Sequence, residues 1–341
     1  MNSILVIHPY FGKFPNIFPF WLESCILNTS IDFLIVTDQI IETSSSNIHV
    51  LKTTLPDIKK KIENVLNMPV WLEKPYKLCD FRPLYGMVFS EYTKKYDFWG
   101  YCDCDLIFGN IRYFLTEEVL NNYDYIMGWG HFHIQRTIDA KYEKVWKTAR
   151  GLWRDINWKQ VFQSDKNEWF DELPYGVSGR YYEMYPDRCW MGYKDDHACY
   201  ESPTPSKLTF KSLFNSYELW QTWDGYQKHL KRLPFLFRTK GNDLENMLYY
   251  KNDIDLYVIG LNEQNQIEKL PVLYVHFYKR NLSIKTVNKL NYLIRPDAII
   301  HSKKINRINL YYYSHHPSIY LKYIKCKLER KYNNIKKIYI S

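Results

Sequence analysis

Short apolar runs that end in polar loops open the chain and define its first predicted elements. Residues 4–7 and 33–38 are apolar runs of strand length, and residues 18–28 between them fit a helix. Residues 47–51 predict a third strand, and a lysine-rich helix follows near residues 56–67. This order indicates a parallel sheet of the Rossmann type. We therefore expect an α/β fold with a mostly parallel sheet and helices on both of its faces.

Two aspartates after an aromatic segment are the strongest chemical signal in the sequence. Residues 80–92 predict a helix, residues 98–102 predict a strand, and Asp103 and Asp105 follow that strand directly. In an extended backbone, residues two apart point to the same side, so both carboxylates can reach one divalent cation. Open α/β sheets bind ligands at the carboxyl ends of their strands. We therefore expect Mg²⁺ or Mn²⁺ here, bridging the diphosphate of a nucleotide; a solvated turn is the alternative.

The charge is concentrated at the C terminus. The chain has 46 Lys and Arg against 37 Asp and Glu, a formal net charge of +9. Residues 302–341 hold ten of these cations and one acid, so the first 301 residues carry no net charge, which argues against a nucleic-acid partner. Within this tail Tyr320, Ile324, Leu328 and Tyr332 recur every four residues. The spacing predicts an amphipathic helix on an anionic membrane surface; a helix packed on the body, with its lysines in water, is the alternative.

Two further features bear on the compartment. The first residues contain no basic region followed by a long apolar run, so no signal peptide is predicted. The seven cysteines are scattered without a Cys-x-x-Cys pair, which is typical of reduced thiols. We expect a cytoplasmic protein that is peripheral on the inner face of the plasma membrane through its tail.

Tryptophan is dense in the second half of the chain, where eight of the 11 tryptophans lie between residues 129 and 223. Flat aromatic faces suit sugar rings, so one or two would line an acceptor groove while the others belong to the core. Asp171 and Glu172 follow Trp169 and Phe170, and a desolvated carboxylate there could deprotonate an acceptor hydroxyl if the reaction inverts configuration. If configuration is retained, these acids would orient a substrate; a solvated loop is the remaining alternative.

Several stretches of the first 135 residues resemble metal-dependent GT-A glycosyltransferases, above all those of bacterial capsule and other surface-polysaccharide clusters. They are the loop at residues 9–16 with Asp38 after the second strand, residues 77–83 (KLCDFRP) and residues 99–105 (WGYCDCD). The resemblance implies a GT-A-like fold in which Asp103 and Asp105 hold the ion and the diphosphate of a nucleotide-sugar. His8, Tyr10 and the rest of the 8–13 loop would contact the nucleotide together with Asp38.

The same resemblance assigns roles to six more residues. Lys77, Asp80 and Arg82 would flank the donor's phosphate and sugar, although a helix cap and a solvated charge explain them equally well. In related enzymes a histidine late in the chain completes the metal shell. This nominates His276, within the strand-like run 272–280, against a satisfied core histidine. Lys279 or Arg280 would then contact the diphosphate.

These expectations describe a glycosyltransferase that moves a sugar from a UDP-sugar to a glycan or lipid-linked oligosaccharide in bacterial surface-polysaccharide synthesis. We expect a donor-binding region over residues 1–130, an acceptor-binding and site-completing region over residues 131–285, and the basic tail over residues 286–341. Two alternatives stay open. A metal-dependent nucleotidyltransferase would more often carry a glycine-rich phosphate loop, and a non-catalytic carbohydrate-binding or membrane-adapter protein would need no metal.

Overall fold

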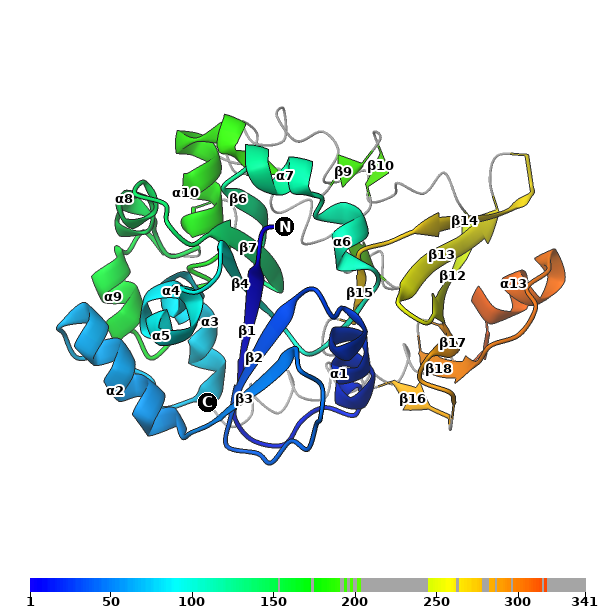
Figure 1. Cartoon of the computed structure of the whole chain (residues 1–341), viewed down its shortest axis with the longest axis horizontal. Helices are drawn as coiled ribbons and strands as arrows, with labels where there is room; N and C mark the ends of the chain where they lie inside the picture. Colours follow the sequence, from blue (N-terminus) through cyan, green and yellow to red (C-terminus); the bar gives the residue numbers. More distant parts are fainter. Residues whose placement is uncertain are drawn as a thin grey trace, which may run out of the picture.

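A seven-stranded sheet forms the centre of the computed structural model (Figure 1). The structure describes residues 1–317 except 153, 173–174, 191–192, 195–196, 199–200, 204–244, 262–263, 278–281, 286, 296 and 315. The strand order is β3-β2-β1-β4-β7-β6-β8. These strands are β1 (Ile4–Tyr10), β2 (Asp32–Thr37), β3 (Ile48–Lys52), β4 (Phe98–Cys102), β6 (Tyr125–Trp129), β7 (Phe132–Arg136) and β8 (Cys189–Trp190).

The pairing of β1 confirms the predicted mostly parallel sheet. β1 pairs in parallel with β2 on one side and with β4 on the other. β2 with β3 and β6 with β8 are also parallel, whereas β7 runs antiparallel to β4 and β6. The chain moves outward from β1 through β2 to β3 and then returns to the opposite side of β1 as β4. The strand order therefore reverses between β1 and β4, and open α/β sheets bind ligands beyond the carboxyl ends of strands at such a reversal.

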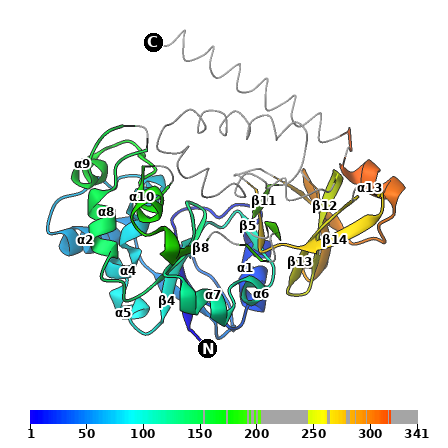
Figure 2. The same cartoon turned by 90° about the horizontal axis from the view of Figure 1, so that it is seen from above.

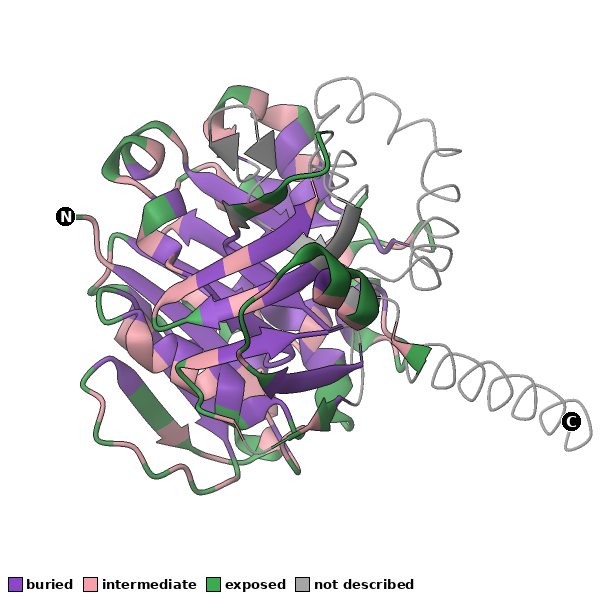
Figure 3. Cartoon of the chain, turned by 90° about the vertical axis from the view of Figure 1, so that its right-hand side faces the viewer, coloured by how far each residue is buried: buried purple, intermediate pink, exposed green. Residues whose placement is uncertain are grey.

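Helices cover both faces of this sheet, as predicted. Alternate residues of β1 point to opposite faces, so Ile4 and Val6 join one core and Leu5 and Ile7 join another. The first core contains α1 (Phe18–Leu27), and the second contains α2 (Leu55–Leu66). Figure 3 shows the strands of the sheets as mainly buried.

The polypeptide between β3 and β4 is helical but broken. α2 begins after the N-cap Thr54, whose side chain accepts the Asp57 N–H, and ends at Asn67 in a left-handed conformation. The single helix predicted over residues 80–92 is instead a series of short turns. Pro83 has no N–H to continue an α-helix and accounts for the first break, and a second break lies at Phe89. These turns are α3 (Leu78–Phe81), η2 (Arg82–Leu84), α4 (Tyr85–Val88) and α5 (Ser90–Thr93), and η1 (Pro75–Lys77) precedes them.

The helices of the middle of the chain are also short. Asn110, Thr116 and Asn157 each cap a helix start with a side-chain oxygen. The elements are α6 (Ile111–Phe114), α7 (Glu117–Asn122), α8 (Tyr142–Thr148), α9 (Trp158–Gln163), α10 (Val177–Met184) and η3 (Pro186–Arg188). Among the described residues, no helix is long and apolar enough to cross a bilayer.

Three smaller sheets complete the described structure. A two-stranded sheet has the order β10-β9, a three-stranded sheet has the order β11-β15-β5, and a six-stranded sheet has the order β14-β13-β12-β17-β18-β16. The six-stranded sheet and α13 (Arg307–Ser314) lie at the opposite end of the molecule from α8 and α9 (Figures 1 and 2). The strands are β5 (Leu106–Phe108), β9 (Tyr193–Lys194), β10 (His197–Ala198), β11 (Glu201–Pro203), β12 (Glu245–Asn252), β13 (Asp255–Leu261), β14 (Ile267–Pro271), β15 (Tyr274–His276), β16 (Ser283–Ile284), β17 (Asn291–Ile294) and β18 (Ala298–His301).

The region boundaries expected at residues 130 and 285 both fall within continuous sheets. β6 and β7 lie on either side of residue 130 in one hairpin, and the six-stranded sheet contains strands from both sides of residue 285. Ile17 and Phe20 of the α1 segment, with Ile107 of β5, share a core with the six-stranded sheet. The division of the chain by function stays a prediction. The membrane helix predicted at residues 320–332 lies outside the described residues.

Candidate functional site

Asp103 and Asp105 lie where β4 ends, beside the reversal of strand order. The N–H of Asp103 donates to the carbonyl of His131 at 2.9 Å, which extends the pairing of β4 with β7. The chain then enters β5, which pairs antiparallel with β15 so that Leu106 faces His276. The N–H of Phe277 donates to the carbonyl of Asp105 at 2.9 Å. This ladder brings a histidine from late in the chain to the two aspartates.

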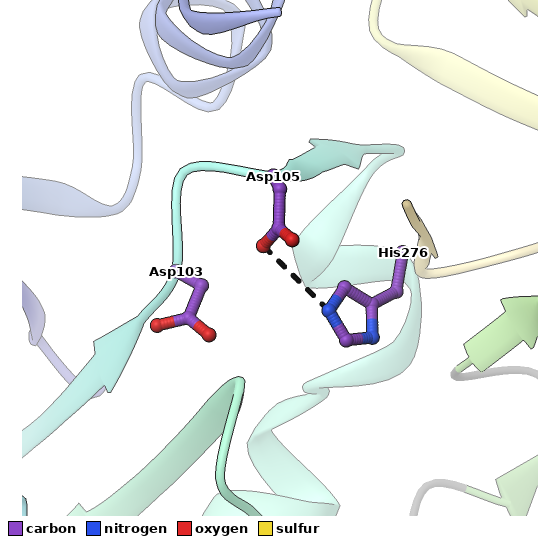
Figure 4. A group of neighbouring side chains, drawn as sticks. All are labelled: Asp103, Asp105 and His276. Carbon is purple, nitrogen blue, oxygen red and sulfur yellow. Dashed lines mark ion pairs between the residues drawn. The ribbon is translucent and has the colours of Figure 1, made fainter. Parts of the chain in front are cut away.

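Asp103, Asp105 and His276 form a group that can hold one metal ion (Figure 4). One ligand atom from each lies within 4.8 Å of the others, and Asp105 Oδ1 is 3.6 Å from His276 Nε2. Asp105 and His276 are buried, whereas Asp103 is half-buried. Metal–oxygen and metal–nitrogen bonds of about 2.0–2.2 Å place the ligands of one ion about 3–4 Å apart, and the 3.6 Å between Asp105 and His276 matches that spacing. Two carboxylates and one imidazole offer both oxygen and nitrogen ligands to a divalent ion.

Arg82 joins this group to a second acid. Its guanidinium forms ion pairs with Asp103 and, at 2.8 Å, with Asp171. The guanidinium also lies over the ring of Tyr101, 5.4 Å from the ring centre. Arg82 is 7% exposed and Asp171 is fully buried. Arg82 therefore provides the positive charge that Asp171 needs in this interior, and one nitrogen of the same group holds Asp103.

Asp171 and Glu172 lie close to the three candidate metal ligands, and their catalytic role stays a prediction. Burial raises the pKa of the Asp171 carboxyl, and the Arg82 guanidinium opposes that rise. Burial also raises the pKa of Glu172, and the charge of Asp171 raises it further. The Glu172 carboxylate packs against Gly130, where an added Cβ would lie 2.4 Å from Glu172 Oε1. Of the two acids, Asp171 is buried and Glu172 is half-buried.

Lys77 and Asp80 form a buried ion pair at 2.8 Å. Lys77 Nζ also donates to the carbonyls of Val161 and Lys166 at 2.8 and 2.6 Å, so the three N–H groups of its ammonium are used inside the protein. Asp80 accepts the backbone N–H groups of residues 168 and 170. This geometry assigns the pair to holding the segment that leads into Asp171; direct contact of Lys77 or Asp80 with a donor stays a prediction.

The loop after β1 and the residue after β2 lie side by side. The N–H of Gly12, at φ +95°, donates to Asp38 Oδ1 at 3.0 Å. Tyr10 ends β1, and its hydroxyl donates to the carbonyl of Lys13. His8 is buried, with Nδ1 2.8 Å from the carbonyl of Cys102, and burial lowers its pKa. The structure thus brings His8, Tyr10 and Asp38 to the same edge of the sheet as the aspartates.

His131 is a neighbour of the site that the sequence analysis did not select. Its ring stacks on that of His276, with centroids 4.1 Å apart. In the sequence it lies between Gly130 and Phe132, and no motif marks it as a site residue in preference to His133 two residues later. His133 is a core histidine bonded to Ile126 and Gln135. Lys279 and Arg280, predicted phosphate contacts, lie outside the described residues.

Several tryptophans of the second half are core residues. Trp146 and Trp190 are buried, and Trp158 packs against the core that contains α8 and α9. Trp169 is half-buried, precedes the acids at 171 and 172, and adopts a positive φ of 48°. A role of Trp169 or of any other tryptophan toward an acceptor stays a prediction.

Comparison with known proteins gives a family and weak similarities to solved structures. No curated protein matches the sequence. A glycosyltransferase involved in the glycosylation of the major capsid of PBCV-1 superposes over 82% of this chain and 95% of its own, at 11% identity and a TM-score of 0.33. Mouse xyloside xylosyltransferase 1, in its apo form, superposes over 65% of this chain and 93% of its own, at 10% identity and a TM-score of 0.35. TM-scores this low indicate only partial agreement in chain path. A family model described as "Family of unknown function (DUF6625)" matches residues 6–303, and the chain belongs to this family.

Proposed function

We propose that this protein is a metal-dependent glycosyltransferase that uses a nucleotide-sugar donor. The observation that carries the proposal is the convergence of Asp103, Asp105 and His276 at the carboxyl end of β4. This place lies at the reversal of strand order, where nucleotide ligands bind in open α/β sheets. A divalent ion bound there would neutralise the diphosphate that leaves when the sugar is transferred.

The residues of the chain would share the work on the donor. Asp103, Asp105 and His276 would hold the ion, and their mixed oxygen and nitrogen donors favour Mn²⁺ over Mg²⁺. The 8–13 loop and Asp38 are adjacent to each other and would bind the nucleotide, which we propose to be uridine. Lys279 or Arg280 would add positive charge to the diphosphate.

Glu172 is the residue we propose as general base if the reaction inverts configuration. Asp171, the other candidate, is fully buried, with Oδ2 paired to Arg82, so it is less open to an acceptor than Glu172. Glu172 is half-buried and packs against the hairpin tip at Gly130, next to the segment that holds Asp103. An acceptor hydroxyl near Glu172 would give up its proton as the glycosidic bond forms. We propose a glycan or lipid-linked glycan of bacterial surface polysaccharide as this acceptor, met at a membrane surface by the basic tail.

Thermal unfolding with nucleoside diphosphates tests the donor site. Wild-type protein is heated with UDP, GDP, CDP or ADP, each with and without Mn²⁺, because a ligand that binds only the native state raises the unfolding temperature. We expect a rise of several degrees with UDP and Mn²⁺ together, absent in Asp105→Asn. Asp155→Asn is the matched control, because Asp155 is an exposed residue paired with Arg150. No rise with any nucleotide would contradict the proposal.

Product analysis separates transfer of sugar from transfer of nucleotide. A glycosyltransferase given a UDP-sugar and Mn²⁺ releases UDP, and slow hydrolysis to free sugar and UDP is expected even without an acceptor. A nucleotidyltransferase given UTP and a sugar phosphate releases pyrophosphate. If the protein releases pyrophosphate and no UDP, the reaction at this metal group is nucleotidyl transfer rather than the proposed sugar transfer.

A further inference from the structure

His131 lies at the tip of the β6–β7 hairpin and touches both segments that carry the proposed metal ligands. Its backbone carbonyl accepts the N–H of Asp103 at 2.9 Å. Its ring stacks on His276, with centroids 4.1 Å apart and planes 23° apart. Its Nε2 lies 3.0 Å from the hydroxyl of Tyr274. One residue therefore connects the loop after β4 to strand β15.

The backbone of β6 accounts for this position. The register of β6 with β7 shifts between Ile126 and Trp129, which is a β-bulge. Met127 and Gly128 within the bulge have φ values of 71° and 69°, in the left-handed region. Bulges of this kind redirect a strand and are frequent beside active sites. A left-handed non-glycine residue such as Met127 costs about 1–3 kcal/mol, so the surrounding structure enforces this path.

We propose that His131 is a positioning residue of the metal site, an inference that rests on the proposed function. Among the described residues, the group whose ligand atoms lie in mutual reach contains Asp103, Asp105 and His276 but not His131. His131 would therefore act through its neighbours rather than on the ion. Tyr274 and His276 are two apart on β15 and point to the same side, so the tyrosine holds the ring that lies against His276.

The consequence is a defined effect on metal affinity. Removing a group that orients a metal ligand typically lowers affinity 10- to 100-fold. His131→Ala removes both the stacking on His276 and the bond to Tyr274. We expect its Mn²⁺ affinity to fall about 10- to 100-fold, while the carbonyl that holds Asp103 is retained.

Mn²⁺ titration followed by the electron paramagnetic resonance of the free ion measures this affinity without any nucleotide or turnover. His131→Phe and Tyr274→Phe keep ring volume but each removes the same hydrogen bond. We expect both to lower Mn²⁺ affinity to a similar, smaller extent, and the double variant to lose no more than either single variant. Unfolding temperatures measured without metal show whether each variant is folded.

His133→Gln is the matched control, because His133 bonds Ile126 and Gln135 and lies outside the metal group. Its Mn²⁺ affinity should equal that of the wild type. Folded His131→Ala that binds Mn²⁺ as tightly as wild type would overturn the role of His131 alone. If His131→Ala does not fold, the two phenylalanine variants decide instead. Additive losses of Mn²⁺ affinity in the double variant, or no loss in either single variant, would then overturn the role of His131. A wild-type protein that binds no Mn²⁺ would overturn the proposed metal site as well.

Discussion

Removing the Arg82 charge should destabilise the protein far more than removing a surface cation. Arg82 is 7% exposed and pairs with Asp171, which is fully buried, as well as with Asp103. In Arg82→Met the Asp171 carboxylate keeps its place in the interior but loses its partner. Breaking a buried pair from one side costs about 3–5 kcal/mol, because an uncompensated charge is left out of water. An exposed pair such as Arg150 with Asp155 is worth about 1 kcal/mol or less.

Urea unfolding at pH 7.5 measures these free energies. We expect Arg82→Met to lower the free energy of unfolding by about 3–5 kcal/mol and the control Arg150→Met by about 1 kcal/mol or less. Asp171→Asn, added to Arg82→Met, removes the unpaired charge and should recover at least half of the loss. A loss near that of Arg150→Met, or a double variant as unstable as the sum of the two single losses, would refute the reasoning that Arg82 neutralises Asp171.

Four further predictions concern the hairpin tip, the core and the segment before the acids. In Gly130→Ala the new Cβ would lie 2.4 Å from Glu172 Oε1, the flexible end of a side chain. The carboxyl of Glu172, the proposed base, would have to shift, so UDP release from a UDP-sugar should fall several-fold with little change in unfolding temperature. A large loss of stability would contradict this. In Gly100→Ala the Cβ would lie 2.0 Å from the carbonyl of His133, so urea unfolding should show a loss of about 1–3 kcal/mol or more; wild-type stability would exclude this tight packing. Burial lowers the pKa of His133 to about 4, so the neutral ring stabilises the fold above pH 6.5. Between pH 6.5 and 4.5 about 2–3 kcal/mol of that stability should be lost in wild type but not in His133→Gln; equal pH slopes would contradict it. Asp80→Asn weakens the acceptor for the N–H groups of residues 168 and 170 and leaves the buried Lys77 without its partner carboxylate. Urea unfolding should therefore show a free energy of unfolding lower by about 3–5 kcal/mol. An unchanged midpoint would contradict the structural role of Asp80.

The elements read best from the sequence are those with local signals. The strands at β1, β2, β3 and β4 and the helices α1 and α2 were predicted within a few residues, because an apolar run or a helical period marks each of them. The broken helix at residues 78–93 differs, because Pro83 interrupts it. The six-stranded sheet was not predicted, because its strands are stabilised by pairing with neighbouring strands, as β12 pairs with β13 and β17, rather than by a local sequence pattern.

The acidic residues of the candidate site were predictable from the sequence, but the contacts that join the site to the rest of the fold were not. Asp103 and Asp105 stand out because two carboxylates directly follow a buried strand. The burial of Lys77 and Asp80 is invisible in a sequence, where both look like solvated charges. The position of His131 depends on a bulge three residues earlier and on a strand far along the chain. Contacts of that kind are decided by tertiary packing rather than by local spacing.

The pairing of β5 with β15 also determines when the proposed metal site can form during synthesis. Asp105 is made roughly 170 residues before His276, and their strands meet only after both have left the ribosome. At about 5–20 residues per second this interval lasts about 10–30 s. Contacts between residues so far apart in sequence also form late and slowly during folding. Metal binding would thus occur only in a chain whose two halves have joined, so a nascent or truncated chain holding both aspartates would lack the histidine that completes the group.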